Sequence, residues 1–122
     1  MTKNYKLWLD SFMYAWQQRD VETIMNIISK HCIYFETVFD TPCSSFDNIK
    51  KLWEVVPKNQ KNIEYNYEIL IENDKLCIVN FFVKRMLIPS EVKQQINGIF
   101  QIPLDEDNKC CFFKQWRAIK KI

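Results

Sequence analysis

The last part of the chain carries the side chains best suited to recognising a ligand. Alternation along a predicted strand over 110–119 places Phe113, Gln115 and Arg117 on one face and Trp116 on the other. A guanidinium group presents a planar fork of donors that suits a carbonyl or a carboxylate. The segment therefore predicts a polar, ligand-facing end on an otherwise apolar strand.

Other reactive residue types do not form a recognisable site. The five cysteines include no CxxC pair, and the single histidine, His31, provides no zinc pattern. The adjacent Cys110 and Cys111 would point to opposite faces of a strand, which favours structural thiols. The single glycine, Gly98, excludes the glycine-rich loops that hold nucleotide phosphates. We therefore expect no metal and no cofactor.

Composition predicts one globular domain over 1–122. Hydrophobic residues make up 48% of the 122 residues and aromatic residues 15%, which excludes a disordered chain. The net charge of +2, from 17 basic and 15 acidic residues, is too small for a nucleic-acid partner. There is no N-terminal signal and no long apolar span, so we expect no membrane contact. With free thiols, this indicates a reducing cytoplasm.

The first half of the chain alternates helices with one strand. We predict a helix over 5–18, a second from Asp20 to Ile28, a strand over 33–38 and a loop over 40–45. Ser44 with Asp47 resembles a capping box that opens a third helix, and Pro57 ends that helix.

The second half has the period-two pattern of strands joined by tight turns. We predict strands over 63–72, 76–87, 92–102 and 110–119, the last two joined by a hairpin turn at 105–108. This order predicts an α+β fold in which three N-terminal helices pack on a curved, mainly antiparallel sheet.

This layout resembles the SnoaL-like and nuclear-transport-factor-2-like superfamily, which includes ketosteroid isomerase. The similar segments are Trp16–Ile24 (WQQRDVETI), Asn97–Phe100 (NGIF) and Leu104–Lys109 (LDEDNK). The resemblance implies a cone-shaped, cystatin-like roll. It also implies a homodimer formed through the open sheet face and, for any enzyme activity, a cofactor-free isomerisation or cyclisation.

The resemblance to the isomerase assigns roles to single positions. Its general-base carboxylate falls on Glu36, whereas its two oxyanion-stabilising groups fall on Phe12 and Phe100, which cannot donate a hydrogen bond. Glu36 and Arg117 could then pair at the mouth of the cone, as a ligand clamp or as an acid–base pair. A structural ion pair, or an Arg117 left in solvent, is the alternative.

The ligand would lie among large apolar side chains. We expect the pocket walls to be Phe12, Trp16, Tyr34, Trp53, Phe82, Phe100 and Phe113, with Gln115 beside Arg117. A filled core without a cavity is the competing interpretation. The sequence thus predicts binding of a small, mainly apolar molecule. The alternative is a non-catalytic dimeric interaction or adaptor module, marked by exposed aromatics at Tyr65, Tyr67, Phe81 or Trp116.

Overall fold

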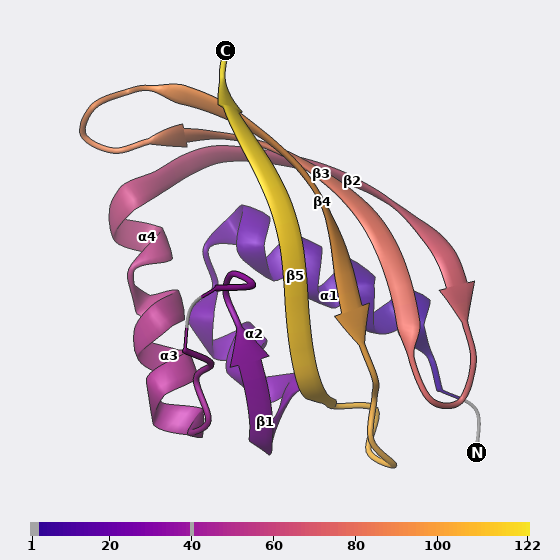
Figure 1. Cartoon of the computed structure of the whole chain (residues 1–122). Coiled ribbons are helices and arrows are strands. Elements are labelled where there is room, and N and C mark those ends of the chain that lie inside the picture. The colour runs from indigo at the N-terminus through magenta and orange to yellow at the C-terminus, as the bar shows by residue number, and fades with distance from the viewer. Residues whose placement is uncertain (1–2, 40) are drawn as a thin grey trace.

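A curved sheet of five strands wraps over four helices in the computed structural model of the chain, which describes residues 3–39 and 41–122 (Figure 1). The helices are α1 (Tyr5–Gln18), α2 (Val21–Asn26), α3 (Phe46–Glu54) and α4 (Val56–Asn59). The strands are β1 (Ile28–Phe35), β2 (Gln60–Glu72), β3 (Cys77–Leu87), β4 (Lys93–Ile102) and β5 (Cys110–Lys121). Their order in the sheet is β1-β5-β4-β3-β2. β1 runs parallel to β5, and the other neighbours are antiparallel. The predicted α+β class is confirmed.

The first two helices begin at side-chain caps, and α1 has its predicted bounds of 5–18. The side chain of Asn4 accepts from the backbone N–H of Leu7 at 3.0 Å, and Arg19 ends α1 in a left-handed conformation with φ 56°. Asp20 caps α2 by accepting from the Thr23 N–H at 3.2 Å. No helix among the described residues is long and apolar enough to cross a lipid bilayer.

β1 begins earlier than predicted. Ile28 was expected on the second helix, but α2 ends at Asn26 and Ile28 is the first residue of β1. There it is buried and lies opposite Cys110 of β5. The neighbouring strand therefore decides the conformation of this apolar residue, because helix and strand patterns overlap in so short a segment.

Two predicted boundaries near the third helix are also wrong. Ser45, not Ser44, caps α3, since its hydroxyl accepts from the Asn48 N–H at 3.1 Å. Pro57 does not end the helical path but lies in the first turn of α4. A proline is tolerated there because the first N–H groups of a helix have no intrahelical partner. In the predicted loop, Asp40 lies outside the described residues.

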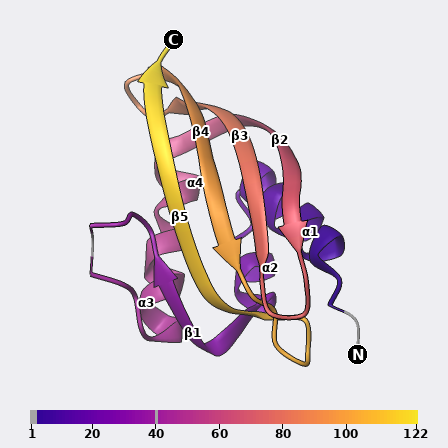
Figure 2. The ribbon, with the colours of Figure 1, turned by 45° about the vertical axis from the view of Figure 1, so that its right-hand side comes forward.

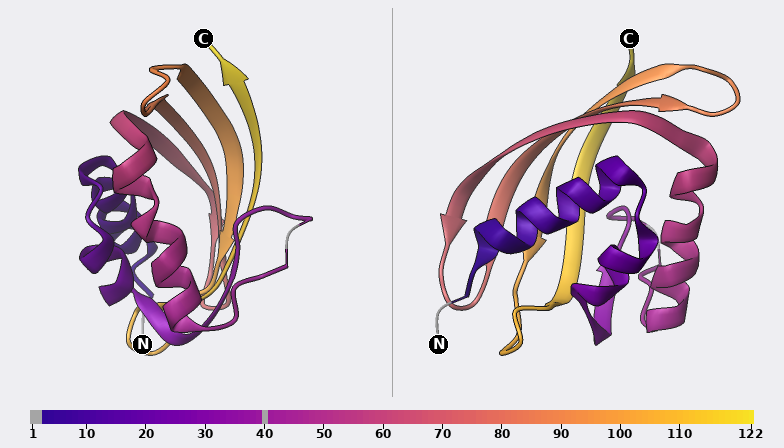
Figure 3. Two further views of the ribbon diagram at one scale, coloured as in Figure 1. Left: turned by 90° about the vertical axis from the view of Figure 1, so that its left-hand side faces the viewer. Right: turned by 180° about the vertical axis from the view of Figure 1, so that it is seen from behind.

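The four helices lie against one face of the sheet and leave the other face uncovered (Figures 2 and 3). Alternation along β3 buries Phe81 against the helices, whereas Phe82 is 40% exposed on the outer face. Phe81, whose exposure would have favoured the adaptor alternative, is fully buried, with its ring stacked on Phe100 at a centroid distance of 3.9 Å. Tyr65 and Tyr67, named as markers of the same alternative, are partly buried against the core.

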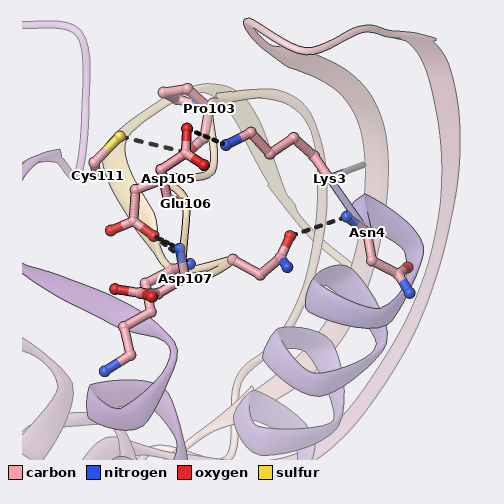
Figure 4. Close-up of polar contacts among 9 residues, drawn as sticks. Lys3, Asn4, Pro103, Asp105, Glu106, Asp107 and Cys111 are labelled. Carbon is pink, nitrogen blue, oxygen red and sulfur yellow. Dashed lines mark hydrogen bonds and ion pairs between the residues drawn. The ribbon is translucent and has the colours of Figure 1, made fainter. Parts of the chain in front are cut away.

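The acidic segment after β4 forms the predicted hairpin turn (Figure 4). One carboxylate oxygen of Asp105 accepts from the backbone N–H groups of Asp107 at 2.9 Å and Lys109 at 3.0 Å. The Asn4 N–H donates to the side-chain oxygen of Asn108 at 3.0 Å, which joins this turn to the start of α1. The carboxylate of Asp105 thus stabilises its own turn.

Candidate functional site

An open cavity of about 250 Å³ lies between the helices and the concave face of the sheet. α3 and α4 stand beside α1 at this side of the molecule (Figure 3). The cavity brings together most of the predicted site residues, namely Phe12, Trp16, Tyr34, Glu36, Trp53, Phe100, Gln115 and Arg117. Aromatic rings form most of its apolar wall, and the charged groups come from the sheet side.

Two predicted wall residues lie elsewhere. Phe82 is on the outer face of β3, because Phe81 and Val83 take the inward positions of that strand. Phe113 faces inward as predicted, but it is 1% exposed and does not reach the cavity. Its ring stacks on Tyr34 at a centroid distance of 4.5 Å and fills the core behind that wall. The structure therefore combines a filled aromatic core with a small remaining cavity.

The expected pair between Glu36 and Arg117 is present. A guanidinium nitrogen of Arg117 lies 3.1 Å from a carboxylate oxygen of Glu36, and the two side chains are 19% and 31% exposed. Glu36 follows the end of β1, which runs parallel to β5 and so brings the two residues together. The chain then returns at Cys43, which exchanges two backbone hydrogen bonds with Tyr34, of 2.9 Å and 2.8 Å.

Arg85 is a third charged residue of the cavity and was not predicted from the sequence. Its Nε donates to the side-chain oxygen of Gln94 at 3.0 Å. Burial lowers the pKa of Arg85, the charge of Arg117 lowers it further, and Glu36 partly offsets both effects. The alternation of side chains along β3 could have indicated this position, because it places Phe81, Val83 and Arg85 on the same face.

The polar groups next to these charges are mostly buried. Burial raises the pKa of Tyr34 well above its usual value, and the nearby charge of Glu36 raises it further. The Tyr34 hydroxyl therefore remains a hydrogen-bond donor at neutral pH. The indole N–H of Trp53 lies near enough to lower this pKa slightly, but outside hydrogen-bond geometry.

Two buried polar atoms at the helix side of the cavity have no hydrogen-bond partner among the described residues. They are Nε1 of Trp53 and Oδ1 of Asn59. By contrast, Nε1 of Trp16 donates to the side-chain oxygen of Gln60 at 3.0 Å. Buried polar groups are nearly always satisfied in folded proteins, so an unpaired donor and acceptor in one cavity indicate room for a polar ligand atom.

The arrangement offers acid–base chemistry and anion binding. Phe12 and Phe100, which occupy the isomerase's oxyanion positions in the resemblance, contact each other edge to face at a centroid distance of 5.7 Å. The available donors instead include the guanidinium groups, Tyr34 and Nε1 of Trp53. Within 3–39 and 41–122, no cluster of three or more His, Cys, Asp or Glu side chains could hold a metal ion.

Comparison with known proteins supports the fold and leaves the activity open. No protein-family model and no curated protein matches the chain. One similar structure is that of SalBIII, an epoxide hydrolase/cyclase-like enzyme with a role in pyran ring formation in polyether salinomycin. Its TM-score is 0.82 at 14% identity, over 96% of this chain and 95% of that one.

Two other similar structures have different descriptions. An NTF2-like protein of unknown function from Exiguobacterium has a TM-score of 0.75 at 14% identity, covering 91% of this chain and 98% of its own. A Mycobacterium tuberculosis protein in complex with estradiol-17beta-hemisuccinate has a TM-score of 0.79 at 6% identity, covering 93% and 95%. The chain therefore has the cone fold of SnoaL-like and NTF2-like proteins, as the sequence predicted.

Proposed function

We propose that the protein binds a small, mainly apolar molecule in the cavity, with Glu36 and Arg117 holding its polar group. The observation that carries this proposal is the ion pair of 3.1 Å at the edge of a cavity walled by aromatic rings. Such a combination of apolar walls and a few convergent polar groups is typical of small-molecule sites. The unpaired atoms of Trp53 and Asn59 add a second polar contact for the ligand.

The size of the cavity limits the ligand. At about 250 Å³ it is slightly smaller than the range of about 300–1,000 Å³ that is usual for drug-sized ligands. The aromatic walls suit a flat or compact apolar body. We therefore propose a ligand of one or two rings, or of similar bulk, that carries an oxygen-containing group.

Cofactor-free isomerisation or cyclisation is the activity that these residues would serve. Glu36 would move a proton, and Arg117 with Tyr34 would stabilise the negative charge that develops on an oxygen atom. The similar enzyme SalBIII is described as epoxide hydrolase/cyclase-like, which supports chemistry of this class in a cone of this shape. The fold alone does not decide between catalysis and simple binding.

Native mass spectrometry of the purified protein tests the proposal. A bound molecule should appear as added mass that is released on denaturation, and its mass then identifies the ligand class. The added mass should be lost in Arg117→Gln, which removes the cation of the pair, and kept in Lys84→Gln, which changes an exposed cation of β3. If every sample contained only unliganded protein, including protein analysed directly from lysate with minimal purification, ligand binding would be contradicted.

A non-catalytic dimeric adaptor is the second candidate. The outer face of the sheet is uncovered by helices, and Phe82 and Trp116 are 40% and 39% exposed there. Exposed aromatic side chains on one face are typical of interfaces. Light scattering should then give the mass of a homodimer, and Trp116→Lys should give a monomer. A monomeric wild-type protein at micromolar concentration would contradict this candidate.

A cytoplasmic location is also proposed. All five cysteines are free, and three of them, Cys32, Cys77 and Cys110, are buried. Free thiols persist in a reducing compartment. Fractionation of cells that produce the protein tests this location, and recovery in an oxidising compartment would contradict it.

A further inference from the structure

The charges of the cavity do not balance. Its three charged residues are Glu36, Arg85 and Arg117. The single carboxylate pairs with Arg117 at 3.1 Å. Arg85 has no ion-pair partner among residues 3–39 and 41–122, and its Nε contacts only the neutral amide of Gln94 at 3.0 Å. Counted over the described residues that line it, the cavity therefore holds one positive charge more than it holds negative charges.

This unpaired cation is costly where it lies. Arg85 is partly buried, and both its burial and the neighbouring Arg117 disfavour its charged form, which Glu36 offsets only in part because that carboxylate pairs with Arg117. A guanidinium nevertheless stays protonated in proteins, so the cost is borne by the fold. An arginine on the wall of a cavity, with no ion-pair partner among residues 3–39 and 41–122, is a candidate for ligand recognition.

We propose that the ligand is an amphipathic carboxylic acid, whose carboxylate is bound by Arg85 beside the pair of Arg117 and Glu36. This inference rests on the proposed function and names the class of its ligand. A monoanion fits because it neutralises the single excess positive charge. A phosphate dianion would reverse the imbalance. The N–H groups of Arg85 that do not face Gln94 remain available for the carboxylate oxygens.

The rest of such a ligand fits the remaining walls. Phe12, Trp16, Trp53 and Phe100 form an apolar surface beyond the charged edge. A carboxylate fixed at Arg85 would direct an aromatic or alicyclic body toward these rings. Arg85 is then a specificity-determining residue that distinguishes an acid from its neutral amide or ester.

A matched pair of probes tests this inference by isothermal titration calorimetry. The probes are 2-naphthoate and 2-naphthamide, which share the ring system and differ in charge. Wild-type protein at low salt should bind the naphthoate at least about tenfold more tightly, since charge-assisted hydrogen bonds are stronger than neutral ones. The preference should decrease as the salt concentration rises.

Tryptophan side chains report where the probes bind. Of the four tryptophans, Trp16 and Trp53 line the cavity, whereas Trp116 lies on the outer face. Naphthoate should shift the indole N–H signals of Trp16 and Trp53 in a nuclear magnetic resonance spectrum and leave that of Trp116 unchanged. A shift of Trp116 alone would overturn the inference, because the acid would then bind outside the cavity.

Two variants on one strand separate the role of Arg85 from a general charge effect. Arg85→Gln should remove the preference for naphthoate and change naphthamide binding less than about twofold. Lys84→Gln removes the same charge from the outer face of β3 and should keep the preference. If Arg85→Gln is unfolded, Arg85→Lys replaces it and should weaken the preference, because lysine lacks the guanidinium fork.

The outcomes distinguish this inference from the proposed function. Equal binding of the two probes, or tighter binding of naphthamide, would overturn the carboxylate inference and leave small-molecule binding intact. A preference that survives in Arg85→Gln would assign the anion to another residue and also overturn it. Failure of both probes to bind would contradict the proposed function itself.

Discussion

The charge arrangement of the cavity predicts that its two paired residues contribute unequally to stability. Glu36→Gln removes the one carboxylate that the described residues bring to the cavity wall, and leaves the guanidinium groups of Arg85 and Arg117 without that partner. In Arg117→Gln, Glu36 remains near Arg85, and the positive charge of Arg85 still compensates the carboxylate of Glu36. The loss of the acid should therefore cost more than the loss of the base, although both variants break the same ion pair.

The distance of 3.1 Å sets the scale of this effect. Coulomb attraction at that separation is about 5 kcal/mol for an effective dielectric constant of about 20, and about 1 kcal/mol for that of water. The side chains of Arg117 and Glu36 are 19% and 31% exposed, so solvent screens them in part. After desolvation and side-chain entropy, we expect a loss of about 2 kcal/mol for Glu36→Gln and about 1 kcal/mol for Arg117→Gln.

Urea unfolding followed by tryptophan fluorescence measures these free energies at pH 7 and low salt. Glu68→Gln, on the outer face of β2, is the matched control and should change stability by less than about 0.5 kcal/mol. Adding Arg85→Gln to Glu36→Gln should recover part of the lost stability, since it removes one of two facing cations. High salt should likewise reduce the cost of Glu36→Gln.

The reasoning would be refuted by a simple result. If Arg117→Gln is as destabilising as Glu36→Gln, or more so, Arg85 does not contribute to the electrostatics of the pair. The same conclusion follows if the double variant with Arg85→Gln is less stable than Glu36→Gln alone. In either case the carboxylate inference would also lose its electrostatic basis.

Three further predictions concern packing and ionisation, each measured by urea unfolding. Gly98→Ala should cost about 1–3 kcal/mol, because a Cβ there would lie 2.6 Å from the ring of Phe81; an unchanged midpoint would contradict this close approach. The hydrogen bond from Lys6 lowers the pKa of Asp10 below 3.8, so its stabilisation is present above that pH and is lost as the pH falls. Asp10→Asn should cost only about 0.5 kcal/mol at pH 7, since the carboxylate is 46% exposed, and less than that at a pH of about 2. An equal cost at both pH values would disprove the coupling. Burial raises the pKa of Tyr34 above 10. The buried neutral hydroxyl therefore makes its full contribution to the free energy of unfolding below pH 10, and this contribution falls as the pH rises further. In Tyr34→Phe, the free energy of unfolding should fall less steeply with pH above 10. An unchanged slope would contradict the role of Tyr34.

The helices and strands with regular apolar periodicity were predictable, because the local sequence pattern and the tertiary packing favour the same conformation there. The helix over 5–18 has an apolar stripe and a capping asparagine, and it is α1. At Ile28 and Ser45, the local sequence pattern alone did not determine the conformation. Ile28 fits both a helix and a strand by local pattern, and only its pairing with Cys110 decides. Of two adjacent serines, backbone geometry selected Ser45 as the cap.

The site was predictable to a similar extent. Alternation placed Phe113, Gln115 and Arg117 on one face of β5, and the hypothesis that Arg117 pairs with Glu36, rather than lying in solvent, agrees with the ion pair of 3.1 Å. Phe82 was misplaced because the phase of an apolar run cannot be determined when Phe81, Phe82 and Val83 are all apolar. Arg85 was missed for the same reason, since its direction depends on that phase.

The order of residues along β5 gives the site an apolar end and a polar end. On the inner face of this strand Phe113 is 1% exposed, Gln115 is 4% exposed, and the side chain of Arg117 is 19% exposed. Polarity and exposure thus increase together toward the end of the strand. An amphipathic molecule buries most apolar area, and keeps its charge hydrated or paired, only when its polar group lies at the Arg117 end. Reversing the molecule would bury its charge against Phe12 and Phe100, so a single orientation is favoured before any specific contact is formed.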